Sequence, residues 1–129
     1  MRPSSPDVSQ LIYHITTLTG WAEAQATSEV VAESFAAEGF IHCSRQAQLL
    51  AVANRFFPGG DGLLVLAIEE DGVAEWLVNE GPTGAGDPFA LDVFPHVYAP
   101  IPTSAVVAAV PLNADEHGQF AWPTNLPHS

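Results

Sequence analysis

The stretch Leu-Leu-Val-Leu-Ala-Ile at residues 63–68 (LLVLAI) is a continuous apolar run near the middle of the chain. Such a run, preceded by the turn sequence PGGDG (58–62), predicts a β-strand that is buried on both faces. A helix is predicted just before it, over 45–57, because apolar residues recur there at helical spacing. A turn follows the run, and EWLVN (75–79) is typical of another strand.

The rest of the chain contains further short elements of both kinds. We expect strands over 11–17 and 40–44, a helix over 20–27 capped by Thr19, an extended segment over 92–102, and a helical turn followed by a last strand over 103–112. Residues 28–39 are ambiguous, since Val30 and Val31 favour a brief strand while ESFAAEG favours a helical turn stopped by Gly39. Strands and helices mix without regular alternation, which indicates the α+β class.

Three segments differ in composition from the rest of the chain. EGPTGAGDP (80–88) is predicted to be a long loop, of the kind that often carries function or mobility. The three prolines within 92–102 indicate a sheet edge or a guarded loop.

We expect residues 1–10 to form a flexible arm, 11–112 to form one domain, and 113–129 to form a peripheral tail, because both ends are polar and contain proline.

Composition excludes several classes of protein. The chain has 129 residues, of which 47% are hydrophobic, so it can bury the core of one domain. It carries 15 acidic residues against 3 arginines and no lysine, a net charge of −12 that repels phosphate backbones and argues against binding to nucleic acid. Any anionic ligand would need a local feature such as a helix N-terminus or an arginine.

Cysteine usage and hydropathy predict where the protein works. Cys43 is the single cysteine, so no disulfide framework can form within the chain, which suits a reducing cytosol. The first residues contain no apolar stretch of the signal-peptide kind, and no run approaches the roughly 18 apolar residues of a membrane span. We therefore expect a cytoplasmic protein that does not associate with membranes.

The stretch FIHCS (40–44) places three side chains that can take part in chemistry next to one another: an imidazole, a thiol and a hydroxyl. In a strand, residues i and i+2 share one face, so His42 and Ser44 are expected on one side and Cys43, with Ile41, on the other. Cys43 is then a small core residue rather than a nucleophile paired with His42. The interpretation of His42 and Ser44 as a polar strand end stays open beside a functional one.

The same spacing of histidine and hydroxyl occurs twice more. His14 and Thr16 lie in YHIT, and His96 and Tyr98 lie in PHVY. Imidazole beside a hydroxyl can donate to and accept from sugar hydroxyls or phosphate oxygens. Each pair taken alone is more often a polar edge or a satisfied buried histidine.

Charged residues extend this candidate site. Arg45 is expected in the first turn of a helix capped by Ser44, where free N–H groups would form an anion pocket. Arg55 near the end of that helix is best explained as a charge that suits the helix dipole. Glu80, at the mouth of the long loop, could polarise a sugar hydroxyl or act as a base, although chance placement is the simpler explanation for one acid among 15.

A metal site is not expected. His14, His42 and His96 could ligate zinc if their strands converge, but no two of them lie at the local spacing of known zinc motifs.

The motifs IYHIT, GFIHCS, VANRFFPG, LLVLAI and FPHVYAPIP, in this order, resemble the bacterial family called domain of unknown function 952. The resemblance covers residues 11 to 112 and is carried most specifically by GFIHCS followed by ANRFF. It implies a fold related to the ADP-ribosyltransferase superfamily, a small domain with a split mixed β-sheet and NAD bound in its cleft. The RNA 2′-phosphotransferase branch is similar in its early strand histidine and its H-x-S strand.

The resemblance implies roles residue by residue. His14 matches the histidine at the adenosine-side ribose, and His42 and Ser44 match the strand that faces the nicotinamide ribose. The superfamily's late-strand acid has no clean match, and His96 or Glu80 could occupy its position. The shortage of arginines and the net charge of −12 argue against an RNA substrate.

The resulting hypothesis is a domain that binds NAD or an ADP-ribosyl compound and, as a further step, transfers ADP-ribose to a small molecule or protein. Its partner is a small-molecule nucleotide, and the oligomeric state stays open. Two alternatives are a non-catalytic metabolite-binding module and, less favoured, a zinc-dependent hydrolase. The candidate catalytic residues are His42, His96 and Glu80. The candidate cofactor-binding residues are His14, Thr16, His42, Ser44, Arg45 and Tyr98.

Overall fold

The computed structural model describes residues 10–81 and 93–129, apart from the side chain of Ser34. The elements are β1 (Leu11–Thr17), α1 (Leu18–Thr27), β2 (Glu29–Val30), α2 (Glu33–Glu38), β3 (Ile41–His42), α3 (Leu49–Phe56), β4 (Leu63–Glu69), the 3₁₀ turns η1 (Glu70–Gly72) and η2 (Ala74–Trp76), β5 (Leu77–Glu80), β6 (Phe94–Val97), β7 (Ile101–Pro102), the 3₁₀ turn η3 (Thr103–Ala105) and β8 (Val106–Leu112). Short helices and antiparallel sheets share one small domain, which confirms the α+β class. The predicted arm, except Gln10, and most of the predicted 80–88 loop lie outside the described residues.

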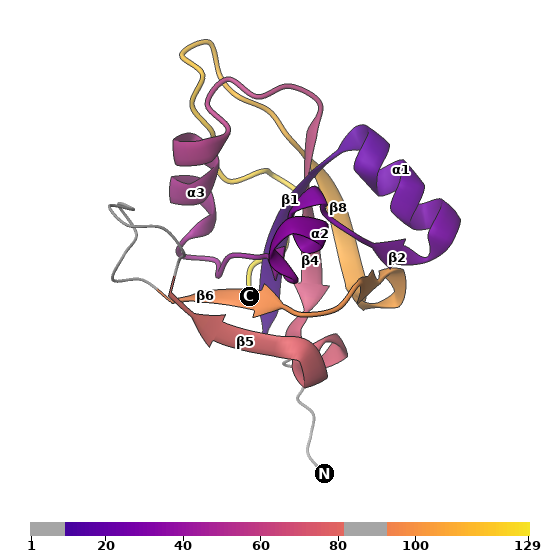
Figure 1. The fold of residues 1–129 in the computed structure, drawn as a ribbon. Helices are drawn as coiled ribbons and strands as arrows, with labels where there is room; N and C mark the ends of the chain where they lie inside the picture. The colour runs from indigo at the N-terminus through magenta and orange to yellow at the C-terminus, as the bar shows by residue number, and fades with distance from the viewer. Residues whose placement is uncertain (1–9, 82–92) are drawn as a thin grey trace.

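The predicted strand at 63–68 is the centre of the main sheet, whose strand order is β1-β4-β8 (Figure 1). Its Leu63, Val65 and Ala67 pack into a core cluster with Tyr13 of β1, while its Leu66 packs into a second cluster. The alternation of the strand therefore supplies both faces with apolar side chains, and the prediction of a strand buried on both faces is confirmed.

A second sheet, with the order β3-β6-β5, is joined to the first through one bridge between Tyr13 and Ser44. In this sheet β6 is the central strand, although it contains Pro95. The expectation that the prolines of this segment mark a sheet edge is wrong for Pro95. Proline has no N–H to donate, but its carbonyl accepts from Cys43 N at 3.1 Å, so β6 still pairs on the β3 side.

α1 starts earlier than predicted, whereas α2 forms where the sequence indicated a helical turn. α1 begins at Leu18, because the Thr17 hydroxyl, not that of Thr19, accepts from Gly20 N at 2.9 Å. The ambiguous 28–39 segment contains both predicted elements, β2 and α2, and α2 ends at Gly39 with a left-handed φ of 83°.

The helix predicted over 45–57 is shorter at its N-terminus, since α3 begins at Leu49 and its N-cap is Gln48. Ser44 does not cap it. The backbone of Ser44 instead exchanges two hydrogen bonds with Tyr13, of 2.8 and 2.9 Å, which hold it extended beside β1. The chain can therefore turn into the helix only after Ser44, and residues 45–48 form that turn.

The C-terminal segment is not peripheral, as the sequence indicated, but supplies part of the core. Phe120 and Leu126 are 5% and 2% exposed and pack against the cluster of Tyr13. The Tyr13 hydroxyl donates to Pro127 O at 2.7 Å, and Leu11 N donates to Ser129 Oγ at 3.0 Å. The polar composition of the tail concealed these anchors, because only two of its side chains, Phe120 and Leu126, belong to the buried core.

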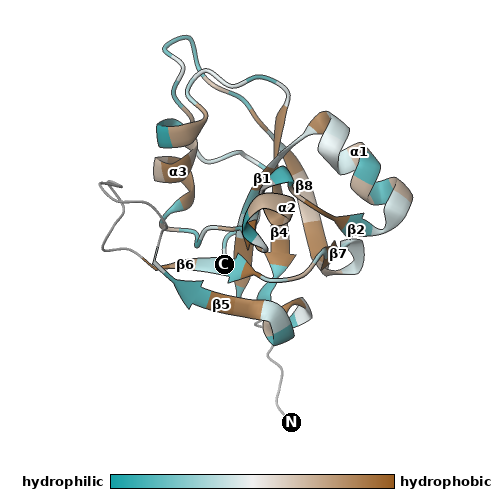
Figure 2. Cartoon of the chain, viewed as in Figure 1, coloured by the Kyte–Doolittle hydropathy of each residue, from teal (hydrophilic) through white to brown (hydrophobic). Residues whose placement is uncertain are grey.

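The two sheets differ visibly in hydropathy. Figure 2 shows β4 and β8 mainly hydrophobic, whereas β6 is paler and partly hydrophilic.

No helix within the described residues is long and apolar enough to cross a membrane.

Candidate functional site

Four ring-bearing side chains and one carboxylate meet at the second sheet. His42 of β3 lies opposite His96 of β6 in the strand register, and their ring centroids are 5.2 Å apart. Phe40 stacks on the His96 ring at 4.1 Å with an interplanar angle of 17°, and its ring also contacts those of His42 and Tyr98. We call Phe40, His42, Glu80, His96 and Tyr98 the histidine–aromatic cluster.

Glu80 binds two members of this cluster at once. Its Oε2 accepts from His96 Nδ1 at 2.8 Å and from the Tyr98 hydroxyl. The hydrogen bond from Tyr98, followed by that from His96, lowers the pKa of Glu80, and Glu80 in turn raises the pKa of Tyr98. Because an ionised carboxylate can only accept, Nδ1 of His96 carries the proton of this hydrogen bond.

His42 is one of the cluster members that face solvent. Its side chain is 49% exposed, and its Nε2 lies 2.7 Å from Glu38 Oε1. Its backbone carbonyl accepts a hydrogen bond of 2.7 Å from Nδ1 of His14. Two acids, Glu38 and Glu80, therefore flank the rings of His42 and His96, which meet edge to face.

His14 lies outside the cluster but binds the backbone of one of its members, His42. It is 6% exposed, and this burial lowers its pKa, which keeps the imidazole neutral near pH 7. Its Nδ1 carries the proton, since the carbonyl of His42 can only accept. His14 therefore positions the His42 backbone.

Of the other candidates, none joins the cluster. The Thr16 hydroxyl lies beside Gly20 at the start of α1. Ser44 is 5% exposed and pairs with Tyr13, so the chain passes from one sheet to the other between His42 and Ser44. The prediction that these two residues share one strand face fails for this reason, since the strand does not continue.

Arg45 is occupied elsewhere. Its Nη1 lies 2.5 Å from Glu70 Oε1, and its Nη2 donates to Asn79 Oδ1 at 2.7 Å. Its backbone N–H donates to the side chain of Gln48 at 2.9 Å. The predicted anion pocket at a helix N-terminus is therefore wrong, because Arg45 precedes the helix and binds a carboxylate instead.

Cys43 is confirmed as a core residue. It packs with Ile41 in the second core cluster, and burial raises the pKa of its thiol to about 12. A thiol that remains protonated at neutral pH is a poor nucleophile, which agrees with the expectation that Cys43 and His42 do not form a catalytic pair.

Sequence reasoning missed two members of the site's surroundings, Phe40 and Glu38. The spacing rule that was applied to His42 and Ser44 also relates Phe40 to His42, two residues upstream, and could have found the ring. Glu38 is the last residue of α2, and it lies near His42 after Gly39 ends the helix in a left-handed conformation. Within residues 10–81 and 93–129, no group of three or more His, Cys, Asp or Glu side chains is placed to hold a metal ion.

Comparison with known proteins gives both a family and a fold. A family model described as "Protein of unknown function (DUF952)" matches residues 15–109. The crystal structure of protein CC0527 from Caulobacter crescentus has a TM-score of 0.75 at 31% identity, covering 86% of this chain and 93% of that chain. The solution NMR structure of CC0527 has a TM-score of 0.71 at 32% identity, with coverages of 84% and 90%. No curated protein matches the chain.

Proposed function

Because the chain belongs to the DUF952 family of proteins of unknown function, we propose its activity from the site itself: the histidine–aromatic cluster binds the ribose of NAD or of another ADP-ribosyl compound. The observation that carries this proposal is the Glu80 carboxylate, which holds His96 and Tyr98 together beside the exposed ring of His42. The same proposal includes that the fold is related to that of ADP-ribosyltransferases, as the resemblance of the sequence motifs implies.

A ribose diol suits this arrangement chemically. Each sugar hydroxyl is both donor and acceptor, and the cluster offers a carboxylate acceptor, a tyrosine oxygen and an imidazole close together. Tyr98 is 41% exposed and His42 is also accessible, so a ligand can reach both side chains without unfolding the sheet. Phe40 and His96 stack behind them and fix their positions.

Charge limits which part of the nucleotide the cluster contacts. Arg45 is engaged by Glu70 and Asn79, and Arg55 lies over the ring of Phe56 at 5.2 Å. Arg2 lies outside the described residues. The cluster therefore recognises the ribose and its attached ring, while a diphosphate would need backbone N–H groups.

A transfer step would use the same charges. When the bond between ribose C1′ and the nicotinamide nitrogen breaks, positive charge develops on the ribose, and a nearby carboxylate such as Glu80 would stabilise it. An acceptor nucleophile would then bond to C1′ and lose its proton to a base. Nε2 of His96 has the chemistry of that base, with Glu80 fixing its tautomer.

One observation favours the second candidate, a binding module without catalysis. His96 is only 2% exposed, and one of its faces is covered by Phe40. A base that is enclosed in this way cannot reach an acceptor unless the surrounding rings move. The binding proposal does not require such movement.

A thermal-shift titration with NAD, ADP-ribose, AMP and nicotinamide tests the proposal. A ligand specific for the native state stabilises it by about 2.7 kcal/mol at a hundredfold excess over Kd. We expect a shift in the wild type that is lost in His42→Ala and reduced in Tyr98→Phe. His117→Ala, at an exposed histidine outside the cluster, serves as the matched control and should keep the shift.

If none of the four ligands shifts the wild type, the proposal is wrong. If a shift occurs, incubation with NAD labelled in its ADP-ribose part and a cell extract separates the two candidates. Transfer of label supports the transferase, and binding without transfer supports the module.

A further inference from the structure

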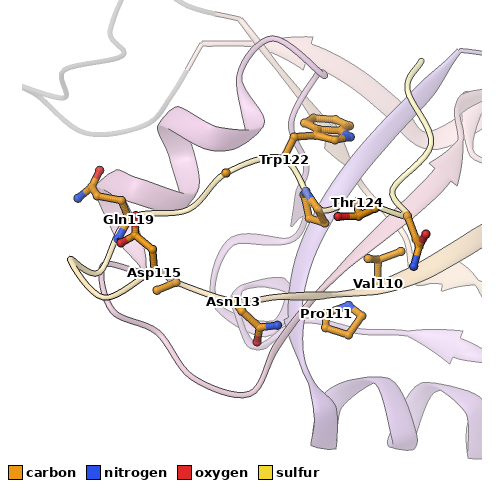
Figure 3. A pocket seen from close by; sticks show the side chains of 11 residues that line it. Val110, Pro111, Asn113, Asp115, Gln119, Trp122 and Thr124 are labelled. Carbon is orange, nitrogen blue, oxygen red and sulfur yellow. The ribbon is translucent and has the colours of Figure 1, made fainter.

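A second candidate site lies near the C-terminus of the chain, where β8 runs into the C-terminal segment. A pocket of about 370 Å³ opens there (Figure 3). Its walls come from the end of β8, from the turn over 115–119 and from residues 121–125, and it shares no residue with the histidine–aromatic cluster. The volume falls within the roughly 300–1,000 Å³ that small-molecule sites occupy.

The polar groups of this pocket are mostly uncharged. The carboxamides of Asn113, Gln119 and Asn125 and the hydroxyl of Thr124 line it, together with the carboxylate of Asp115. Within the described part of the chain, no hydrogen bond occupies the side chains of the four uncharged residues. Among residues 10–81 and 93–129, no arginine or histidine lines the pocket, and Val110 and Pro111 supply an apolar wall.

The frame that carries these groups is rigid. Asp115 Oδ1 accepts from His117 N and Gln119 N, at 2.8 and 2.9 Å, which closes the turn. Asn54 of α3 fixes the next residue, Phe120, by accepting from its N–H at 2.8 Å and donating to its carbonyl at 3.4 Å. Trp122 Nε1 donates to Leu126 O at 3.0 Å. These bonds hold the backbone that carries the polar side chains, so a ligand would not need to order the loop.

We propose that this pocket binds a neutral, hydroxyl-rich small molecule of the size of a monosaccharide. Carboxamides and hydroxyls are each donors and acceptors, and so match sugar hydroxyls in either direction. The carboxylate of Asp115 can accept from a further hydroxyl, whereas it repels phosphate, as does the net charge of −12. This proposal does not depend on the function proposed for the histidine–aromatic cluster.

Backbone amide NMR shifts during titration with D-glucose test the proposal, with glucose 6-phosphate as the charged counterpart. We expect saturable shifts at Asn113, Gln119 and Asn125, and weaker binding of the phosphorylated sugar. Asn113→Ala and Thr124→Ala each remove one hydrogen-bonding side chain and should weaken binding by about three- to tenfold. Thr19→Ala, at an exposed threonine outside the pocket, should leave the affinity unchanged.

Two results would overturn the proposal. One is the absence of saturable shifts at the pocket residues with D-glucose. The other is equal binding of both sugars that neither pocket variant changes, since the lining would then not recognise the ligand. Because Asn113 and Thr124 are exposed, the variants are expected to fold, and an unchanged melting temperature verifies this.

Discussion

The two three-stranded sheets of this protein differ in the side chains that their central strands carry. In β1-β4-β8 the central strand is an apolar run buried on both faces. In β3-β6-β5 the central strand carries His96, whose partners are an acid and a ring. The first sheet is stabilised mainly by removing apolar surface from water, and the second holds titratable groups in fixed geometry near solvent. Both sheets contribute buried side chains to the core, but the second one also brings polar and titratable side chains into contact.

The largest effect should come from a cavity in the main sheet. Leu66 of β4 is 0% exposed, so Leu66→Ala removes buried methyl groups and should lower the free energy of unfolding by about 2–5 kcal/mol. Val78 of β5 is 44% exposed, and Val78→Ala should cost less than about 1 kcal/mol. Urea unfolding of both variants measures the difference. Equal losses of unfolding free energy would show that the main sheet does not depend more on apolar burial than the second sheet does.

The next effect is a dependence of stability on pH, caused by His14 between the sheets. Burial lowers the pKa of His14 below its unfolded value of about 6.5, so below that pH the unfolded chain binds a proton that the folded chain does not. Stability should therefore fall with decreasing pH below about 6.5, by at most about 1.4 kcal/mol per pH unit for one proton.

Urea midpoints of the wild type and His14→Gln between about pH 8 and pH 5 measure this contribution. The variant should show a flatter dependence, while His117→Gln, at an exposed histidine, should follow the wild type. A wild-type slope that survives in His14→Gln would show that another group is responsible. Glu80 acts in a lower window, since its depressed pKa makes its contribution disappear only at acidic pH, near and below about 4.3.

A smaller effect should come from the anchor of the C-terminal segment on the main sheet. Tyr13→Phe removes the hydroxyl that donates to Pro127 O but keeps the buried ring. We expect a loss of about 0.5–1.5 kcal/mol, typical of one hydrogen bond. Thermal unfolding measures the loss, and hydrogen exchange at Leu126 shows whether the tail loosens. No change in either quantity would show that apolar contacts alone hold the tail.

The smallest effect on stability, but a direct one on chemistry, is expected at Glu80. Glu80 raises the pKa of Tyr98, so Glu80→Gln should move that pKa down toward its ordinary value. The chain has two tyrosines, so a Tyr13→Phe background leaves Tyr98 as the single titrating phenol in an ultraviolet titration. An unchanged titration of Tyr98 after Glu80→Gln would mean that the two side chains do not interact in solution.

The order of the elements was largely predictable from the sequence, because the patterns that specify them are local. The run at 63–68 and the turn sequence before it predict the strand, and Gly39 marks the end of α2. Of the candidate site, the sequence identified His42, His96, Tyr98 and Glu80 as chemical groups, by residue type and spacing. The core position of Cys43 followed from strand alternation.

What the residues do for one another was decided by tertiary structure. The pairing of His42 with His96 depends on the register of two strands that are far apart in the sequence. Ser44 and Arg45 were expected in the site, but a bridge to Tyr13 and a bond to Glu70 hold them elsewhere. Local sequence specifies a strand or a helix, because the residues that favour that conformation lie within a few positions of one another. It does not specify which distant side chain satisfies a hydrogen bond, since that depends on how the whole chain closes.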